Sequence, residues 1–117
     1  MNARDEMSRV IGEFAAELRR SVELPANNRK EMIQVRRVIA RHISNIASIV
    51  PNVSEGAAGH PAIRSGFSKV RHATALHQAS WLVVAIKPND PGYLVSLREM
   101  REVNRSFIDF VKATLAE

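Results

Sequence analysis

Residues 34–56 read Gln34-Val-Arg-Arg-Val-Ile-Ala-Arg-His-Ile-Ser-Asn-Ile-Ala-Ser-Ile-Val-Pro-Asn-Val-Ser-Glu-Gly56. Apolar side chains recur in this stretch at steps of three and four residues, the spacing that places them on one face of an α-helix. Arginines stand at other positions of the same stretch, at Arg36, Arg37 and Arg41. The stretch therefore predicts an amphipathic helix that has an apolar face toward a core and a basic flank.

Three further segments show the same helical period, and the interruptions between the four are rich in Pro, Gly or Asn. No segment alternates with period two for long enough to be a strand. We therefore expect one all-α domain over residues 1–117, an antiparallel up-down-up-down four-helix bundle. The predicted helices span residues 3–23, 28–55 with a kink near Pro51, 61–86 and 91–115. An extended helical hairpin that folds only by dimerising uses the same helices and remains an alternative.

Helix starts are predicted by capping residues. An asparagine is followed three residues later by an acid, as in a capping box, at Asn2 with Asp5 and at Asn28 with Glu31. Asp90 precedes Pro91, which suits an N-cap followed by a proline at the first helical position. Gly56 is a natural left-handed terminator for the second helix.

The segment Trp81-Leu-Val-Val-Ala-Ile86 is apolar on all sides if it continues the third helix. A helix that is apolar all round must be buried all round. In a chain of 117 residues we therefore expect this segment to contact another subunit as well as its own bundle. The residues predicted for this oligomer interface are Trp81, Leu82, Val83 and Ile86.

The formal net charge of +5 is unevenly distributed along the chain. It is −1 over residues 1–27, +4 over 28–50, +2 over 51–90 and 0 over 91–117. A localised basic excess is what a polyanion-binding surface requires, because each neutralised phosphate releases counterions. We therefore predict that the second and third helices contact the phosphates of RNA or DNA. The candidate residues are Arg29, Lys30, Arg36, Arg37, Arg41, Arg64, Lys69 and Arg71.

The alternative is a solvated face whose cations pair with acids of the first helix, namely Glu13, Glu17 and Glu23. Stacking aromatics are missing from the basic faces, which argues against a platform for stacked single-strand bases.

Several classes of chemistry have no candidate residues. The chain has no cysteine, which excludes disulfides, thiolate nucleophiles and sulfur-ligated metals. None of the four histidines has a carboxylate at the spacing of bundle metal sites, and paired carboxylates or Gly-rich phosphate loops in a supporting context are missing. We expect a non-enzymatic protein without metal or cofactor. His77 falls in the apolar seam as a core histidine, and His42 at its edge has Ser44, Asn45 or Asn104 as candidate hydrogen-bond partners.

The N-terminus carries acids where a signal peptide has its apolar stretch, and the longest apolar run, Trp81–Ile86, is far shorter than the ~20 residues of a membrane span. We expect a cytoplasmic protein with no membrane contact.

Three features in order resemble a known family: Pro25, then Gln34-Val-Arg36-Arg37, then Ser44-Asn45-Ile46-Ala47. The chain resembles the four-helix-bundle family of proteins encoded in large-subunit rRNA intervening sequences, which includes accessory variability determinant proteins of diversity-generating retroelements. That family closes its second helix with Glu-Gly directly after the Ala. Here Glu55-Gly56 comes seven residues later, two helical turns, so the same face is presented.

The resemblance implies a cytoplasmic bacterial bundle that assembles as a homo-oligomer, typically a pentameric ring. The retroelement members bind nucleic acid and a reverse transcriptase through basic surfaces. For this chain, binding of RNA or DNA is therefore the first hypothesis, with Arg36 and Arg37 at the matched basic positions. A protein-interaction or assembly scaffold with a protein partner and no nucleic-acid binding is the alternative.

Overall fold

Four long helices account for most of the structure, a computed structural model that describes residues 2–22, 29–54, 61–87 and 90–116. They are α1 (Ala3–Val22), α2 (Arg29–Ser54), α3 (Pro61–Ser80) and α4 (Pro91–Leu115), with a short 3₁₀ helix η1 (Val83–Ala85) between the last two. None of the described helices is both long and apolar enough to cross a membrane.

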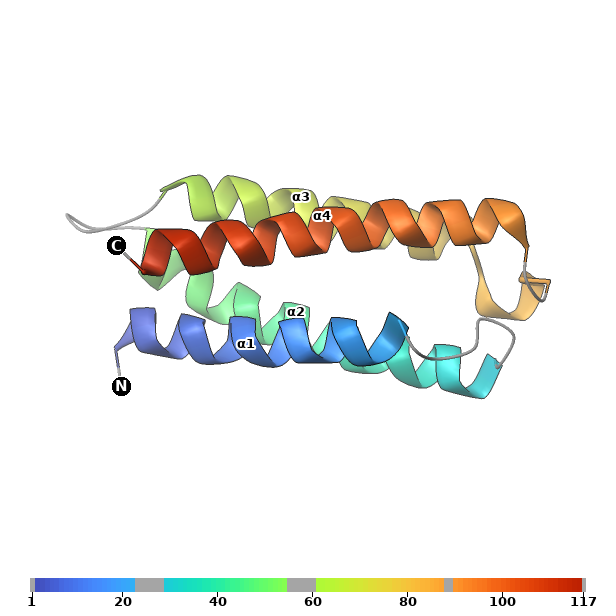
Figure 1. Ribbon diagram of the computed structural model, residues 1–117, viewed down its shortest axis with the longest axis horizontal. Coiled ribbons are helices and arrows are strands. Elements are labelled where there is room, and N and C mark those ends of the chain that lie inside the picture. Colours follow the sequence, from blue (N-terminus) through green and yellow to red (C-terminus); the bar gives the residue numbers. More distant parts are fainter. Residues whose placement is uncertain (1, 23–28, 55–60, 88–89, 117) are drawn as a thin grey trace.

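The helices form an antiparallel up-down-up-down bundle, as predicted. Both α1 and α3 pack against α2 and against α4, so the four helices close a ring within one chain. The beginning of α1 and the end of α4 lie at the same end of the bundle (Figure 1). The molecule measures 49 × 21 × 20 Å. The closed ring differs from an extended hairpin, which would leave α1 and α4 apart.

The core is built from the stripe of apolar side chains that each helix turns inward. Its fully buried members include Met7, Ile11 and Phe14 of α1, Ile46 of α2, Ile63 and Val70 of α3, and Val111 of α4. Gly66 lets α3 approach α4 closely, because a Cβ atom there would lie 3.1 Å from the ring of Phe107. The rings of Phe67 and Phe107 pack with their centroids 5.9 Å apart.

Polar atoms are also buried in this core. Buried atoms of the described core that lack a hydrogen-bond partner include both amide atoms of Asn104, Oγ1 of Thr74 and Nδ1 of His42. The His42 ring instead lies 6.1 Å from the ring of Phe14. The predicted hydrogen bond from His42 to Ser44, Asn45 or Asn104 is therefore not made by Nδ1.

Capping residues begin two of the helices as the sequence indicates. Asp90 accepts hydrogen bonds from the amides of Gly92 and Tyr93 at 2.9 and 3.3 Å, and Pro91 takes the first helical position. Asn2 accepts from the amide of Asp5 at 2.8 Å.

The second helix continues past Pro51 to Ser54. The predicted roles of Pro25, Asn28, Glu55 and Gly56 lie outside the described residues.

The third helix is shorter than predicted. It ends at Ser80 rather than 86, and the chain turns through η1 across the end of the bundle. A straight helix would leave some of its apolar sides in water, whereas the turn buries Ile86 to 4% exposure against Met32 and Tyr93. Trp81 and Val83 pack partly against the same cluster. Ile86 therefore belongs to the chain's own core, and the oligomer interface predicted for this segment stays a prediction.

Candidate functional site

Seven of the eight predicted nucleic-acid-binding residues are exposed, and Arg36 is half-buried. On α2, Lys30 and Arg37 each stand two positions before a core residue, Met32 and Ile39. Two positions rotate a side chain by about 200° around the helix axis, so both point away from the core. Arg41, two positions after Ile39, lies on the same outer side.

The third helix contributes cations in two directions. Arg64 and Arg71 are seven residues apart and so share a face, and the Arg71 guanidinium lies 5.9 Å above the ring of Phe67. Lys69 instead lines a groove between α3 and α4 with Glu102. We use the name α2–α3 basic surface for the exposed residues Arg29, Lys30, Arg37, Arg41, Arg64 and Arg71, which leaves out Lys69 and Arg36.

The acids of the first helix that were candidates to pair with this surface are Glu13, Glu17 and Glu23. Glu13 pairs with Arg9 at 3.0 Å and Glu17 pairs with Arg20 at 2.6 Å, both within α1. Glu23 lies outside the described residues. Glu13 and Glu17 therefore pair along their own helix, whereas the alternative of a solvated face had them pair with cations of the second and third helices.

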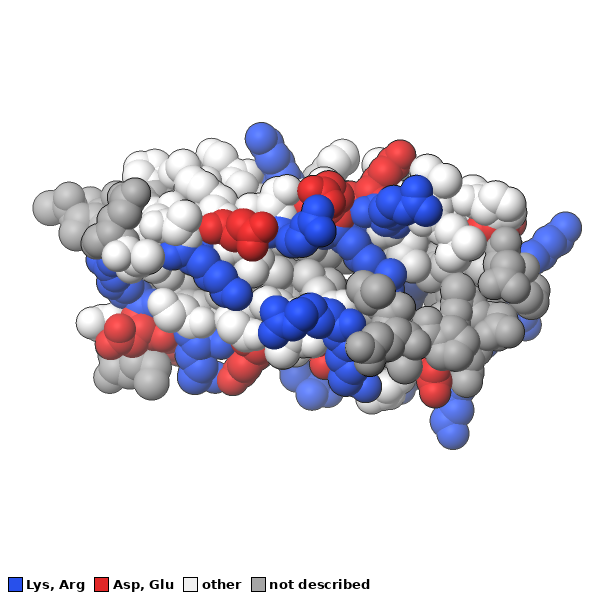
Figure 2. Space-filling view, in the orientation of Figure 1, with Lys and Arg blue, Asp and Glu red and all other residues white. Residues whose placement is uncertain are grey.

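A second basic region, which the charge sums along the sequence missed, is a groove of about 620 Å³ between α1 and α4. Figure 2 shows this face, where basic side chains gather across its middle. The groove is lined by Arg19, Arg98, Arg101, Arg105 and Lys112, and by the acids Glu102 and Asp109. Its formal charge is +3, and Arg105 is paired with Glu102.

The sequence did contain a feature that predicts this groove, namely the spacing of basic residues on α4. Arg98, Arg105 and Lys112 follow one another at steps of seven, which places them in one row on α4. The acids of the same helix cancel these charges when they are summed along the chain, although they do not all lie on the same side.

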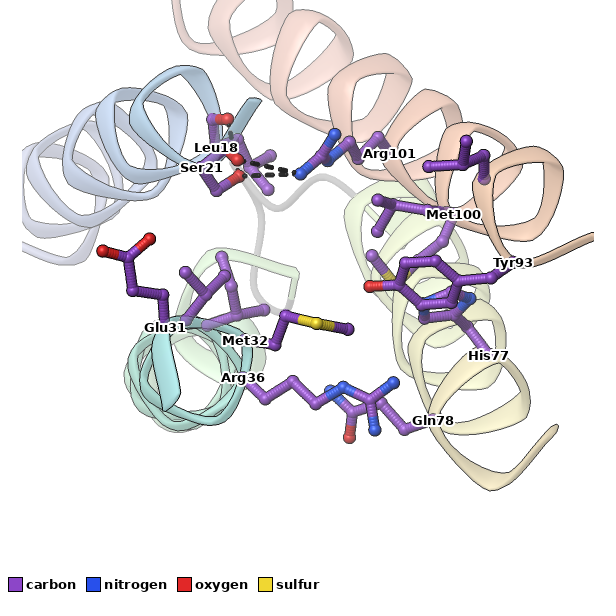
Figure 3. A pocket seen from close by; sticks show the side chains of 14 residues that line it. Leu18, Ser21, Glu31, Met32, Arg36, His77, Gln78, Tyr93, Met100 and Arg101 are labelled. Atoms are coloured by element: carbon purple, nitrogen blue, oxygen red, sulfur yellow. Dashed lines mark hydrogen bonds between the residues drawn. The ribbon is translucent and has the colours of Figure 1, made fainter. Parts of the chain in front are cut away.

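A smaller pocket of about 170 Å³ lies at the end of the bundle where α1 and α3 finish and α2 and α4 begin (Figure 3). Arg36 from α2 and Arg101 from α4 reach it from opposite sides. Between them, Tyr93 and Met32 point into the pocket, and Gln78 lies beside the Arg36 guanidinium.

Each of these arginines holds the carbonyl end of a helix. Arg36 Nη2 donates to the carbonyl oxygen of Trp81 at 2.6 Å, just beyond α3. Arg101 Nη2 donates to the carbonyl of Ser21 at 3.1 Å, in the last turn of α1. A cation at the carboxyl end of a helix interacts favourably with the helix dipole. Both contacts explain in part why these charges are tolerated below the surface.

Comparison with protein-family models, with curated proteins and with solved structures finds no match to this chain. The membership predicted from Gln34-Val-Arg36-Arg37 stays a prediction.

The pocket is positively charged. Burial lowers the pKa of the Arg36 guanidinium, an effect that Tyr93 partly offsets, and burial likewise lowers the pKa of Arg101. A guanidinium nevertheless stays protonated in proteins. Burial and the charges of Arg36 and Arg101 lower the pKa of His77 from 6.5 to about 4, so His77 is neutral near pH 7.

His77 is a core histidine, as predicted, and its Nδ1 lies 2.7 Å from Ser96 Oγ. Among the residues that the structure describes, no three His, Asp or Glu side chains gather as metal ligands would.

Proposed function

We propose that the protein is a non-enzymatic nucleic-acid-binding bundle that contacts the phosphate backbone through the α2–α3 basic surface. The observation that carries the proposal is the charge of these two helices. Residues 29–54 and 61–80 hold eight basic side chains and a single acid, Glu31, a formal charge of +7. The corresponding value for 3–22 and 91–115 together is +1.

The surface suits contacts to phosphates rather than to bases. Its cations are long, exposed and spread over two adjacent helices, and such side chains position a protein on the backbone without reading sequence. Exposed Phe, Tyr or Trp rings, which stack on single-stranded bases, are not among the described residues of α2 and α3. The resemblance of Gln34-Val-Arg36-Arg37 to a family with nucleic-acid-binding members supports the same proposal.

The test is fluorescence anisotropy with a labelled RNA and a labelled DNA duplex over a range of salt concentrations. Binding should weaken steeply with salt. In the triple variant Lys30→Gln, Arg37→Gln, Arg41→Gln, the slope of log affinity against log salt should fall by about 2 to 3, one unit for each lost phosphate contact.

The matched control removes the same charge from the groove between α1 and α4, by Arg19→Gln, Arg98→Gln and Lys112→Gln. Its effect on affinity should be clearly smaller. An equal or larger effect would move the binding surface to that groove, and no binding to either nucleic acid at low salt would reject the proposed function.

The second candidate function is assembly, and it is favoured by the distribution of exposed apolar side chains. Four of the large ones lie toward the pocket end of the bundle, namely Ile33, Leu76, Leu82 and Val95, and Leu82 is 59% exposed. We propose that a homo-oligomer forms through this end rather than through the whole Trp81–Ile86 segment. A pentameric ring remains the form that the family resemblance implies.

A further inference from the structure

Two half-buried arginines share the end pocket without a carboxylate between them. The hydrogen bonds described above lead from Arg36 and Arg101 to neutral oxygens of Trp81 and Ser21. Glu31 also lines the pocket, but its carboxylate points to the far side of α2 from Arg36 (Figure 3). It interacts electrostatically with Arg20 of α1.

The hydrogen bonds to the helix carbonyls do not use all the N–H groups of Arg36 and Arg101. A guanidinium carries five N–H donors in a planar fork, and the hydrogen bonds to the carbonyl oxygens use Nη2 of Arg36 and Nη2 of Arg101. The Tyr93 hydroxyl and the Gln78 amide face the same space (Figure 3). Helix carboxyl ends supply only partial negative charge, roughly half an elementary charge each. Within the part of the chain that the structure describes, the two positive charges are thus incompletely balanced.

The remaining walls are apolar. Met32, Leu94 and Met100 line the pocket along with the polar groups. A volume of about 170 Å³ exceeds the ≈ 30 Å³ that one water occupies in the liquid by several fold. The space therefore suits a ligand that combines one anionic group with a small apolar body.

We propose that this pocket binds a small organic anion, a carboxylate or phosphate monoester on an apolar or aromatic body, with its anionic group held by Arg36. The anionic group accepts hydrogen bonds from the Arg36 guanidinium and from Tyr93 or Gln78, the charge of Arg101 adds attraction from the other side, and the body packs on Met32 and Met100. An oxyanion that accepts two N–H groups from one guanidinium makes the strong, bidentate form of an arginine–oxyanion interaction.

The site is distinct from the α2–α3 basic surface, so the proposal does not depend on nucleic-acid binding. Arg101 also lines the groove between α1 and α4. The positive charge of that groove, +3 from the lining residues, attracts anions toward the neighbouring pocket.

The first experiment titrates the wild-type protein with phenyl phosphate, benzoate and inorganic phosphate at constant ionic strength. Trp81, the single tryptophan of the chain, is the fluorescence reporter, because Arg36 holds its carbonyl and its ring packs edge-on against Tyr93. Thermal unfolding is followed in parallel. We expect saturable binding with a rise in Tm, and affinity about tenfold higher for phenyl phosphate than for inorganic phosphate because the ring is buried.

The decisive variant is Gln78→Glu, which keeps the side-chain size and places a carboxylate beside Arg36. This carboxylate should form an ion pair with the Arg36 guanidinium and so compete with the ligand. Phenyl phosphate binding should weaken by about tenfold or more. Gln34→Glu is the matched control, since it adds the same charge at an exposed position of α2 and should leave binding unchanged.

A second variant covers the case in which Gln78→Glu fails to fold. Arg36→Gln should lose the binding, while Arg9→Gln, on the exposed side of α1, should retain it. The proposal is overturned if the wild type gives no saturable response to any of the three anions. It is equally overturned if Gln78→Glu and Arg36→Gln bind as the wild type does, which would place the anion on the outer surface.

Discussion

His77 shows how burial sets the chemistry of a single residue in this bundle. The side chain is 4% exposed, and Ser96 occupies its Nδ1. Arg36 of α2 and Arg101 of α4 are the nearby cations that oppose its protonation, and burial is the larger cause. The folded state therefore favours the neutral imidazole of His77 over the protonated one.

The pH dependence of stability follows from this residue. The pKa of His77 is about 4 in the folded state and 6.5 in the unfolded reference, so between these values the unfolded chain binds more protons. The free energy of unfolding should thus fall as the pH drops from 6.5 to 4, with a slope contribution of up to about 1.4 kcal/mol per pH unit. Above pH 7 the contribution is constant.

Urea unfolding of wild type and His77→Gln across this range measures the contribution as a difference, because acids titrate in both proteins. The control is His72→Gln, an exposed position on the same helix, which should keep the wild-type slope. Identical pH profiles for wild type and His77→Gln would contradict the lowered pKa.

Asn104 gives a second prediction at this scale. It is 0% exposed, and both amide atoms lack a partner among the described residues. Asn104→Leu replaces a costly buried amide by an apolar group of similar size, and should raise the free energy of unfolding by about 1 kcal/mol. The measurement is urea unfolding. A loss of stability instead would show that the amide is hydrogen-bonded in solution, for example to ordered water.

Among the elements, the stretch that follows α3 closes one end of the core. Ile86 packs with Met32 and Tyr93, and Arg36 holds the carbonyl of Trp81. Asp90 then restarts the chain as the cap of α4. The end of α3 at Ser80 therefore has two favourable effects. It lets Ile86 be buried, and it places the carbonyl of Trp81 where Arg36 can donate a hydrogen bond to it.

Truncation of Ile86 tests this arrangement. Ile86→Ala should lower the free energy of unfolding by about 2 to 4 kcal/mol, since it removes buried methyl groups and leaves a cavity. Leu82→Ala, at the exposed position four residues earlier, should change it by less than about 0.5 kcal/mol at a protein concentration at which the chain is monomeric. The measurement is chemical denaturation of the two variants. Equal losses of unfolding free energy would instead favour the predicted continuous helix from residue 61 to 86.

On the scale of the whole molecule, the exposed charges and the exposed apolar side chains are distributed differently. The excess charge runs along α2 and α3, whereas four of the five large exposed apolar side chains among the described residues lie near the end of the bundle that holds the pocket. A surface for a polyanion and an end for self-association can therefore coexist on one bundle.

Self-association through the pocket end predicts a mass in light scattering that is a multiple of 13.0 kDa. The double variant Leu76→Lys, Leu82→Lys should shift the protein to monomer, because it introduces charge into an apolar interface. Phe110→Lys, toward the opposite end of the bundle, is the control and should keep the oligomer. A monomeric wild type would reject the oligomer.

Much of the fold is readable from local pattern. The apolar period of residues 34–56 and the cap at Asp90 specify a helix and a helix start, because both act over three or four neighbouring residues. The third helix was predicted too long because period alone does not say when burial against Met32 and Tyr93 outweighs helical continuity.

For the basic residues too, local spacing predicts some positions and the packing of the helices decides others. Local spacing places Lys30, Arg37 and Arg41 on the outside of a helix, since a core position fixes the opposite face. Whether Arg36 is on that surface or inside the end pocket with Arg101 depends on two residues 65 positions apart in the chain. Such proximity arises when the helices pack, because packing brings distant side chains together and removes the water around them.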